Sequence, residues 1–246
     1  MRFFIELSYK GTNYHGWQVQ PNANTVQAEI NKALSTILNV KIEVMGAGRT
    51  DAGVHAKQMF AHFDVEVEFD IPKIIVKLNV FLPSDIVIHG IAEVNADANC
   101  RFDAISRTYQ YHIIHQKNPF IEQAYFLHKP LDIEAMNTAC KHLLGMQDFT
   151  SFSKVNTQTF TNNCDISMAL WKWQGKELVF TIKADRFLRN MVRAIVGTLL
   201  EVGVGKIYPD DVKQIIAKKD RCKAGTSVPA HALFLVEVEY PKNSIE

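Results

Sequence analysis

A short stretch at residues 46–56 holds the side chains best suited to chemistry. It contains one carboxylate, Asp51, and one guanidinium, Arg49, among three glycines. Glycine tolerates positive φ and lets other backbone approach closely, so an acid on such a loop can be aimed at a ligand. Arg49 could hold that acid ionised or bind an anionic substrate. An aspartate in a glycine-rich turn also commonly accepts backbone N–H bonds, so the loop alone leaves Asp51 a structural or a chemical role.

Other motifs built from glycine or carboxylate fit this stretch poorly. The third glycine comes at position 53, too late for a dinucleotide fingerprint, and no Gly-Lys-Ser/Thr follows to make a P-loop. A single Asp-Ala-Gly turn does not make an aspartic-protease pair. A glycosidase pair stays open, although no second acid stands out on a comparable loop. The nine histidines are scattered, so we expect no metal site.

Two aromatic residues lie close to basic residues further along the chain. Tyr109 and Tyr111 fall on the same side of a predicted strand, with Arg101 and Arg107 nearby. Bases could stack on that side while the arginines bind phosphate, although tyrosines that face a core are the alternative.

A second basic cluster surrounds Arg193, which lies between apolar neighbours near a predicted buried stripe. A partly buried arginine needs an anion, whereas a solvated helix face is the simpler interpretation of such a cluster. The other members of the cluster are Lys183, Arg186 and Arg189.

The composition is that of an ordinary globular protein, with 246 residues of which 47% are hydrophobic. The net charge of +1 neither requires nor excludes a polyanionic partner, so any nucleic-acid surface must come from uneven placement of charge. Four cysteines without metal-type spacing predict free buried thiols in a reducing cytoplasm. Met1 leads directly into a strand, and no apolar stretch approaches the roughly 18 residues that span a bilayer. We therefore expect a cytoplasmic protein.

Hydrophobic periodicity predicts alternating strands and helices in both halves of the chain. In the first half we expect strands at 3–9, 41–45, 63–69 and 85–94, and helices at 26–38, with Asn24 as its N-cap, and 72–81. In the second half we expect strands at 107–115, 165–173, 177–183 and 234–240, and helices at 133–144, at 191–202 and after 209.

These elements indicate an α+β fold with two similar subdomains, whose mainly antiparallel sheets are flanked by helices. We place the N-terminal subdomain at 1–105, with the Asp51 loop, and the C-terminal subdomain at 106–246, with Tyr109 and Arg193.

Residues 48–56, Gly-Arg-Thr-Asp-Ala-Gly-Val-His-Ala, resemble the signature loop of the TruA family of tRNA pseudouridine synthases. Companion motifs follow in the family's order and approximate spacing, so that the resemblance covers nearly the whole chain. They are Tyr14-His-Gly-Trp17-Gln18, Thr25-Val-Gln27, Arg107-Thr-Tyr109-Gln-Tyr111, Asp148-Phe-Thr-Ser-Phe152, Phe187-Leu-Arg-Asn-Met-Val-Arg193 and Pro229-Ala230 through Tyr240.

The resemblance implies an isomerase of the pseudouridine synthase fold, with a catalytic cleft between the subdomains. Asp51 would be the catalytic aspartate, and Arg193 the cation that keeps it charged when burial would raise its pKa. Tyr109 would stack on a flipped uracil, and Arg49 would contact phosphate or orient the loop. Asp51 could act as nucleophile at C1′ or as base at C2′.

For the substrate, the resemblance implies the anticodon stem-loop of tRNA, at positions 38, 39 and 40. It also implies a homodimer, no small-molecule cofactor and no metal. Two other classes remain open: a tRNA-binding or folding module without turnover, and a nucleoside glycosidase that releases free uracil.

Overall fold

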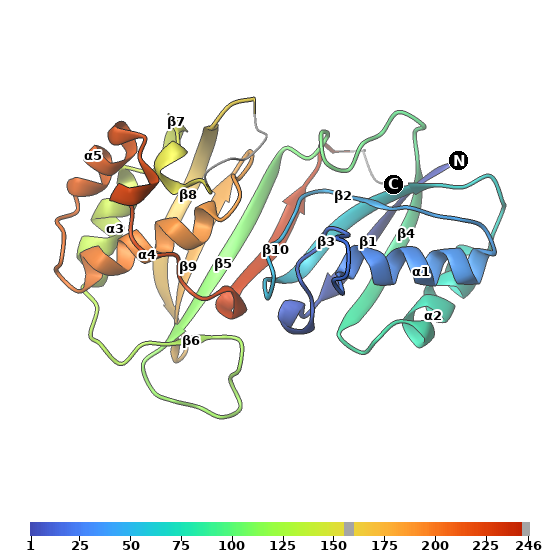
Figure 1. Ribbon diagram of the computed structural model, residues 1–246, viewed down its shortest axis with the longest axis horizontal. Coiled ribbons are helices and arrows are strands. Elements are labelled where there is room, and N and C mark those ends of the chain that lie inside the picture. Colours follow the sequence, from blue (N-terminus) through green and yellow to red (C-terminus); the bar gives the residue numbers. More distant parts are fainter. Residues whose placement is uncertain (155–159, 243–246) are drawn as a thin grey trace. The chain divides into compact units, whose positions relative to one another are not determined.

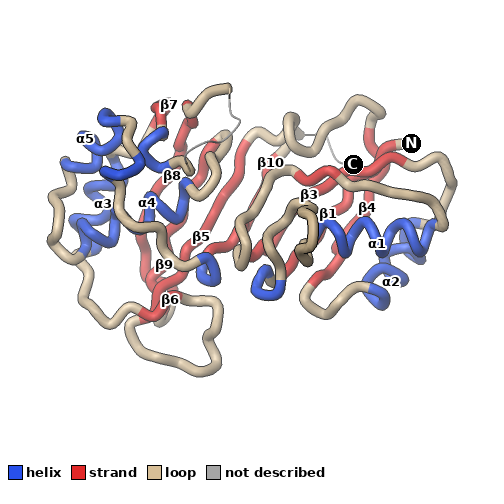
Figure 2. The backbone as a smooth tube through the Cα atoms, in the orientation of Figure 1, coloured by secondary structure: helices blue, strands red, loops and turns tan. Residues whose placement is uncertain are grey.

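The computed structural model describes residues 1–154 and 160–242. The chain forms two compact units (Figures 1 and 2). The first comprises Met1–Ile105 and Leu235–Glu246, and the second comprises Ser106–Phe234.

The first unit is built on an antiparallel sheet. Strand β1 (Arg2–Tyr9) pairs with β3 (His55–Asp64) on one side and with β4 (Ile86–Val94) on the other. The short strand β2 (Met45–Gly46) also pairs with β3, and β10 (Leu233–Glu239) follows β3 in the strand order. Strand β1 is therefore central, and its buried residues form the middle of this core.

Two helices of the first unit, α1 (Val26–Leu38) and α2 (Ile71–Phe81), pack against each other, and α2 also packs on β4. The Thr25 hydroxyl accepts a bond from the N–H of Ala28 and caps α1, so our assignment of Asn24 as the N-cap is wrong by one residue. Asp70 caps α2 in the same manner.

Of the predicted strand at 41–45, only the last residue belongs to a strand, β2. The backbone groups of Ile42 and Val44 instead form hydrogen bonds with side chains of helix α1. The Ile42 N–H donates to the Ser35 hydroxyl at 2.9 Å, and the Val44 N–H donates to the Asn31 side chain at 2.8 Å. Gln27 donates to the Val44 carbonyl at 2.6 Å. A backbone whose polar groups are satisfied by side chains needs no neighbouring strand.

The predicted strand at 63–69 is also displaced, because β3 runs from His55 to Asp64. The alternation after Asp64 has another cause. Val65 is buried and its N–H donates to the Met1 carbonyl, while the Phe69 ring lies 4.8 Å from the Phe3 ring. Val67, between them, is exposed, so the alternation continues past the end of β3 without a continuous buried face.

The second unit contains four antiparallel strands, hydrogen-bonded in the order β5, β9, β8, β7. The bounds are β5 (Ser106–Ile114), β9 (Glu177–Ala184), β8 (Asn163–Gln174) and β7 (Gly145–Asp148). The predicted hairpin is confirmed as β8–β9, with Gly175 at φ +59° in its turn. A short strand β6 (Tyr125–Phe126) pairs with β5 in parallel.

Helices α3 (Ile133–Lys141), α4 (Met191–Gly203) and α5 (Asp211–Lys218) lie together in this unit (Figure 1). Helix α4 is buried along nearly its whole length, and α3 packs on both α4 and β8. Short 3₁₀ helices occur in both units. The first unit contains η1 (Gly11–Asn13), and the second contains η2 (Thr150–Phe152), η3 (Arg221–Lys223) and η4 (Ala230–Ala232).

The predicted α+β class with mainly antiparallel sheets and flanking helices is confirmed. The structure groups Leu235–Glu246 with the first unit, whereas we placed all of 106–246 in the second subdomain. Alternation along 234–240 indicates a strand, but it does not show which strands will pair with it.

All four cysteines are free, as predicted, and three of them are buried. Cys222 is exposed, which corrects the expectation for that residue. Burial raises the pKa of the Cys140 and Cys164 thiols to about 12. No helix in the described part of the chain is long and apolar enough to cross a bilayer.

The Asp148 carboxylate ties η2 to the end of α5. It accepts bonds from the Thr150 N–H and hydroxyl, and one oxygen lies 2.9 Å from Lys219 Nζ. Burial raises the pKa of Asp148, but these bonds outweigh burial and hold that pKa below its ordinary value of 3.8.

We expect Asp148→Asn to lower the free energy of unfolding by about 1–2 kcal/mol at pH 7, or the melting temperature by about 3–6 °C. The difference from wild type should shrink as the pH falls from 3.8 through the lowered pKa of Asp148, because protonation then removes the charge that faces Lys219. Thermal unfolding followed by circular dichroism at pH 7 and pH 3 measures this. An equal difference at both pH values would contradict it.

Candidate functional site

The Asp51 loop joins β2 to β3 in the first unit and ends in a tight turn. The Val54 N–H donates to the Asp51 carbonyl at 3.1 Å, and Gly53 has φ +80°. This positive φ explains the glycine at 53. Asp51 is half-buried and Arg49 is exposed, so the loop presents both charged residues at the surface of the unit.

The segment that follows β1, residues 11–17, holds this loop by backbone hydrogen bonds. The Trp17 N–H donates to the Thr50 carbonyl at 3.2 Å, and the Gly53 N–H donates to the Tyr14 carbonyl at 3.3 Å. The bonds bracket Asp51 on both sides. A loop without a strand neighbour thus acquires a fixed backbone.

Two glycines in this segment make the contact possible. A Cβ added at Gly11 would lie 1.9 Å from the Val54 carbonyl oxygen, and one added at Gly16 would lie 2.5 Å from the Thr50 oxygen. Gly16 also has φ +92°. In the sequence this segment stood out only through the family motif at 14–18, so its role in holding the loop was missed; the glycines ahead of Trp17 were the available signal.

Buried aromatic side chains complete the support. The Tyr9 hydroxyl lies 2.8 Å from the Thr50 hydroxyl, and the Trp17 indole fills the space where a Gly46 side chain would stand. Tyr14 donates to the Asp85 carboxylate at 2.6 Å, and burial together with that bond raises the pKa of Tyr14. Thr50, directly before Asp51, is therefore packed, while Asp51 itself keeps partial exposure.

Tyr109 belongs to the second unit, on β5. It is 9% exposed, and its ring meets the Phe187 ring edge-on at 5.1 Å. Tyr111, on the same side of the strand, is fully buried and donates to the Pro229 carbonyl at 3.0 Å. The core explanation thus applies to Tyr111, whereas Tyr109 lies at the margin of the core.

Arg193 is half-buried in the first turn of α4. Its Nε donates to the Val228 carbonyl at 2.8 Å, and the Val228 N–H donates to the Arg193 carbonyl at 3.2 Å. Two bonds to one residue fix both ends of the arginine. The guanidinium is therefore anchored through Nε on a half-buried side chain.

The structure distributes the predicted site residues between the units. Asp51 and Arg49 share one loop of the first unit, and Tyr109 and Arg193 belong to the second. In the second unit, Arg107 Nη1 donates to the Asp185 carbonyl at 2.9 Å. This bond ties the start of β5 to the residue that follows β9.

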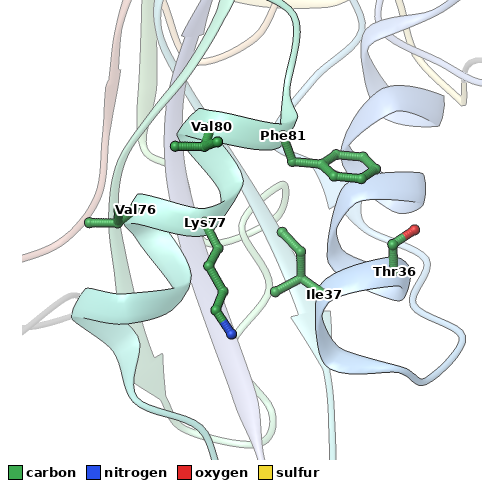
Figure 3. A pocket seen from close by; sticks show the side chains of 6 residues that line it. All are labelled: Thr36, Ile37, Val76, Lys77, Val80 and Phe81. Atoms are coloured by element: carbon green, nitrogen blue, oxygen red, sulfur yellow. The ribbon is translucent and has the colours of Figure 1, made fainter.

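A hollow of about 650 Å³ lies between α1 and α2 (Figure 3). Its lining contains a single charged group, the Lys77 ammonium, and no carboxylate or imidazole. The residues are Thr36, Ile37, Val76, Lys77, Val80 and Phe81. None of them belongs to the Asp51 loop. Among the described residues, no group of three or more His, Cys, Asp or Glu side chains could hold a metal ion.

Comparison with known proteins gives consistent matches. The model of a family described as tRNA pseudouridine synthase matches residues 7–103 and 139–241. The tRNA pseudouridine synthase A of Parabacteroides distasonis is 56% identical over 243 residues, covering 98% of this chain and 96% of the relative. The enzyme of that name from Bacteroides fragilis is 55% identical over 248 residues, covering 100% and 98%.

More distant sequences match over the same length. The tRNA pseudouridine synthase A of Francisella tularensis subsp. novicida is 40% identical over 247 residues, covering 99% of this chain and 96% of the relative. A crystal structure of a Cbf5-Nop10-Gar1 complex matches with a TM-score of 0.33 and 12% identity, over 80% of this chain and 54% of that one. That likeness is too low to inform the fold.

The glycine contacts of the Asp51 loop predict a stability difference. We expect Gly16→Ala to lower the free energy of unfolding by about 2–4 kcal/mol, because the methyl group meets backbone and the positive φ becomes strained. Gly90→Ala is the control, since Gly90 has open space around its Cβ position and an ordinary φ. Urea unfolding measures both, and equal losses would contradict the close contact.

Proposed function

Because the chain belongs to the tRNA pseudouridine synthase family, we propose that it isomerises uridine at positions 38, 39 and 40 of the tRNA anticodon stem-loop. It is a tRNA pseudouridine synthase, an isomerase of the TruA family. The observation that supports the finer assignment best is the intact loop 48–56, with Asp51 on a backbone-fixed turn.

The reaction rearranges one nucleotide and needs no external reactant. The N1–C1′ bond breaks, the uracil turns while bound, and C5 joins C1′. The proton leaves C5, and N1 gains one, so atoms and electrons balance without an oxidant or a leaving group. The uridine must first leave its stack, at a cost of about a few kcal/mol. We therefore assign the protein the tasks of holding a flipped base and moving charge and protons.

We propose Asp51 as the catalytic carboxylate. Attack at C1′ and proton removal at C2′ both need an ionised oxygen at a defined place beside the ribose. A displacement of about 1 Å can cost 100-fold in rate, so a catalytic acid on a loop needs a loop that does not move. The bonds from Trp17 and Gly53 supply that restraint.

We propose that Arg193 keeps Asp51 ionised once the flipped base has excluded water. Burial without a cation would raise the pKa of the carboxyl and neutralise it. The anchoring of Arg193 Nε on Val228 supports this role, because a guanidinium held in one direction loses less entropy when it meets an anion.

Tyr109 and Arg49 are proposed to contact the RNA. The Tyr109 ring is rigid and 9% exposed, and an aromatic ring of this kind can stack on uracil near C5. Arg49 is exposed on the Asp51 loop, where it could bind a phosphate beside the target nucleotide. Reading phosphates and shape would allow several neighbouring positions to be substrates.

We further propose that the enzyme works in the cytoplasm as a homodimer, without a small-molecule cofactor or a metal. The family resemblance supports the dimer, and the chemistry above has no step that consumes a cofactor.

The first experiment uses anticodon-arm tRNA labelled with tritium at uridine C5. We expect the wild type to release tritium to water without releasing free uracil. Asp51→Asn should reduce this release by about 1,000-fold or more while tRNA affinity changes by less than about threefold, because the reacting carboxylate is lost and its volume is kept. Asp97→Asn, at an exposed acid of the same unit, is the control and should retain activity.

The outcomes separate the candidate functions. Free labelled uracil would indicate a nucleoside glycosidase, and binding without tritium release would indicate a tRNA-binding module. Full turnover by Asp51→Asn would refute the proposed mechanism. Substrates with one labelled uridine at 38, 39 or 40 test each position separately.

Arg193→Ala and Tyr109→Ala should each lower kcat by about 100-fold or more, because both groups are proposed to act on the reacting nucleotide. Their effect on tRNA affinity should be much smaller. Tyr208→Ala is the control for a lost tyrosine, since Tyr208 is 80% exposed. Single-turnover kinetics and filter binding measure the two quantities. Losses of equal size in rate and affinity would refute the assigned roles.

A further inference from the structure

A short segment lies directly on the backbone of helix α4. We call residues 224–229 the α4 strap. A Cβ added at Gly197 of the helix would lie 1.9 Å from the Thr226 carbonyl oxygen, and one added at Gly225 would lie 2.8 Å from the Gly197 carbonyl carbon. The Gly225 N–H donates to the Thr198 hydroxyl at 2.8 Å. Only glycine at both positions allows this contact.

The far end of the α4 strap sets the direction of Arg193. Val228 exchanges bonds with Arg193 through its N–H and its carbonyl, at 3.2 Å and 2.8 Å. The next carbonyl, of Pro229, accepts the Tyr111 hydroxyl. Any displacement of residue 228 therefore moves Nε, and the rest of the guanidinium turns with it.

The Ser227 hydroxyl pins the strap just before this point. It accepts a bond from Asn190 Nδ2 at 2.7 Å and another from Arg221 Nη2 at 2.9 Å. Asn190 precedes α4 with φ +66°, and its side chain makes no capping bond to the helix. The Asn190 amide therefore bonds to Ser227, and its side chain does not accept a bond from the first N–H groups of α4 as a capping asparagine would.

Arg221 holds the strap from the opposite side. Its Nη1 also donates to the Gly225 carbonyl at 3.2 Å and to the Ala224 carbonyl at 3.4 Å. Among the described residues these acceptors are all neutral, with no carboxylate paired to Arg221. A guanidinium spread over neutral oxygens fixes geometry while keeping its charge.

We propose that Ser227 and Arg221 are positioning residues of the synthase, which hold the α4 strap so that Arg193 points at the reacting nucleotide. The inference rests on the proposed function of Arg193. Neither residue needs to touch the uridine. Their effect passes through the Val228 carbonyl to Arg193 Nε, over one peptide unit and one hydrogen bond.

The test is Ser227→Ala, which removes the acceptor of both bonds. We expect kcat for tritium release to fall about 10-fold, with the dissociation constant for tRNA within twofold of wild type. Ser227→Thr keeps the hydroxyl and should recover at least half of the rate. If Ser227→Ala does not fold, Arg221→Lys replaces it, because that change keeps the charge and loses the fork geometry.

Ser35→Ala is the matched control. The Ser35 hydroxyl also ties a loop to a helix through two bonds, both to Ile42. Both alanine variants should lower the melting temperature by a few degrees, and only Ser227→Ala should lower kcat. A similar loss of kcat in both, or a normal kcat in Ser227→Ala, would overturn the proposal.

A double-mutant cycle separates this inference from the function it rests on. Arg193→Lys keeps a cation but not the Nε bond to Val228, so Ser227→Ala should cost less than twofold in that background. A full 10-fold loss there would refute positioning through Arg193. If Arg193→Lys and Arg193→Ala both kept wild-type rates, the proposed role of Arg193 itself would fail.

Discussion

The close contact between residues 11–17 and the Asp51 loop is the constraint on which the first unit depends. A loop has no ladder of strand bonds, so its backbone must find other partners before it can hold a side chain still. Here the two backbones touch because Gly11 and Gly16 have no Cβ, and Trp17 bonds to Thr50 on one side of Asp51. Strand β1 delivers the first segment and β3 leaves from the second. The pairing of β1 with β3 therefore places residues 11–17 beside the Asp51 loop.

In the second unit, close backbone contact at glycines likewise fixes the position of a charged residue. Gly197 and Gly225 let the α4 strap lie on a helix, and the strap holds Arg193. In both units a charged residue on or beside irregular backbone is fixed by glycine contacts and by bonds between segments distant in sequence. An isomerisation that consumes no second substrate depends on such placement, since the protein must hold its reacting groups beside one nucleotide.

Periodicity identified many of the buried residues, and it predicted the elements well where one helix or one hairpin supplies its own hydrogen bonds. It failed where polar partners come from elsewhere. The residues before β2 alternate like a strand, yet Asn31 and Ser35 of a helix bind their N–H groups. After Asp64, Val65 exchanges backbone bonds with Met1, Phe69 packs on Phe3, and Val67 is exposed. A buried face can be inferred from one sequence, but the identity of its partner cannot.

For the site, the sequence by itself identified the candidate acid, its loop and the family, because the motif at 48–56 is a local string of residue types. Tertiary structure alone decided what holds that loop and what holds Arg193. The Arg193 anchor lies 35 residues away at Val228, and the Gly53 partner lies on the segment before α1. Such contacts depend on backbone approach in space, which leaves only isolated glycines as a trace in the sequence. The same limit applies to β10, whose pattern shows a strand and whose place beside β3 comes from the fold.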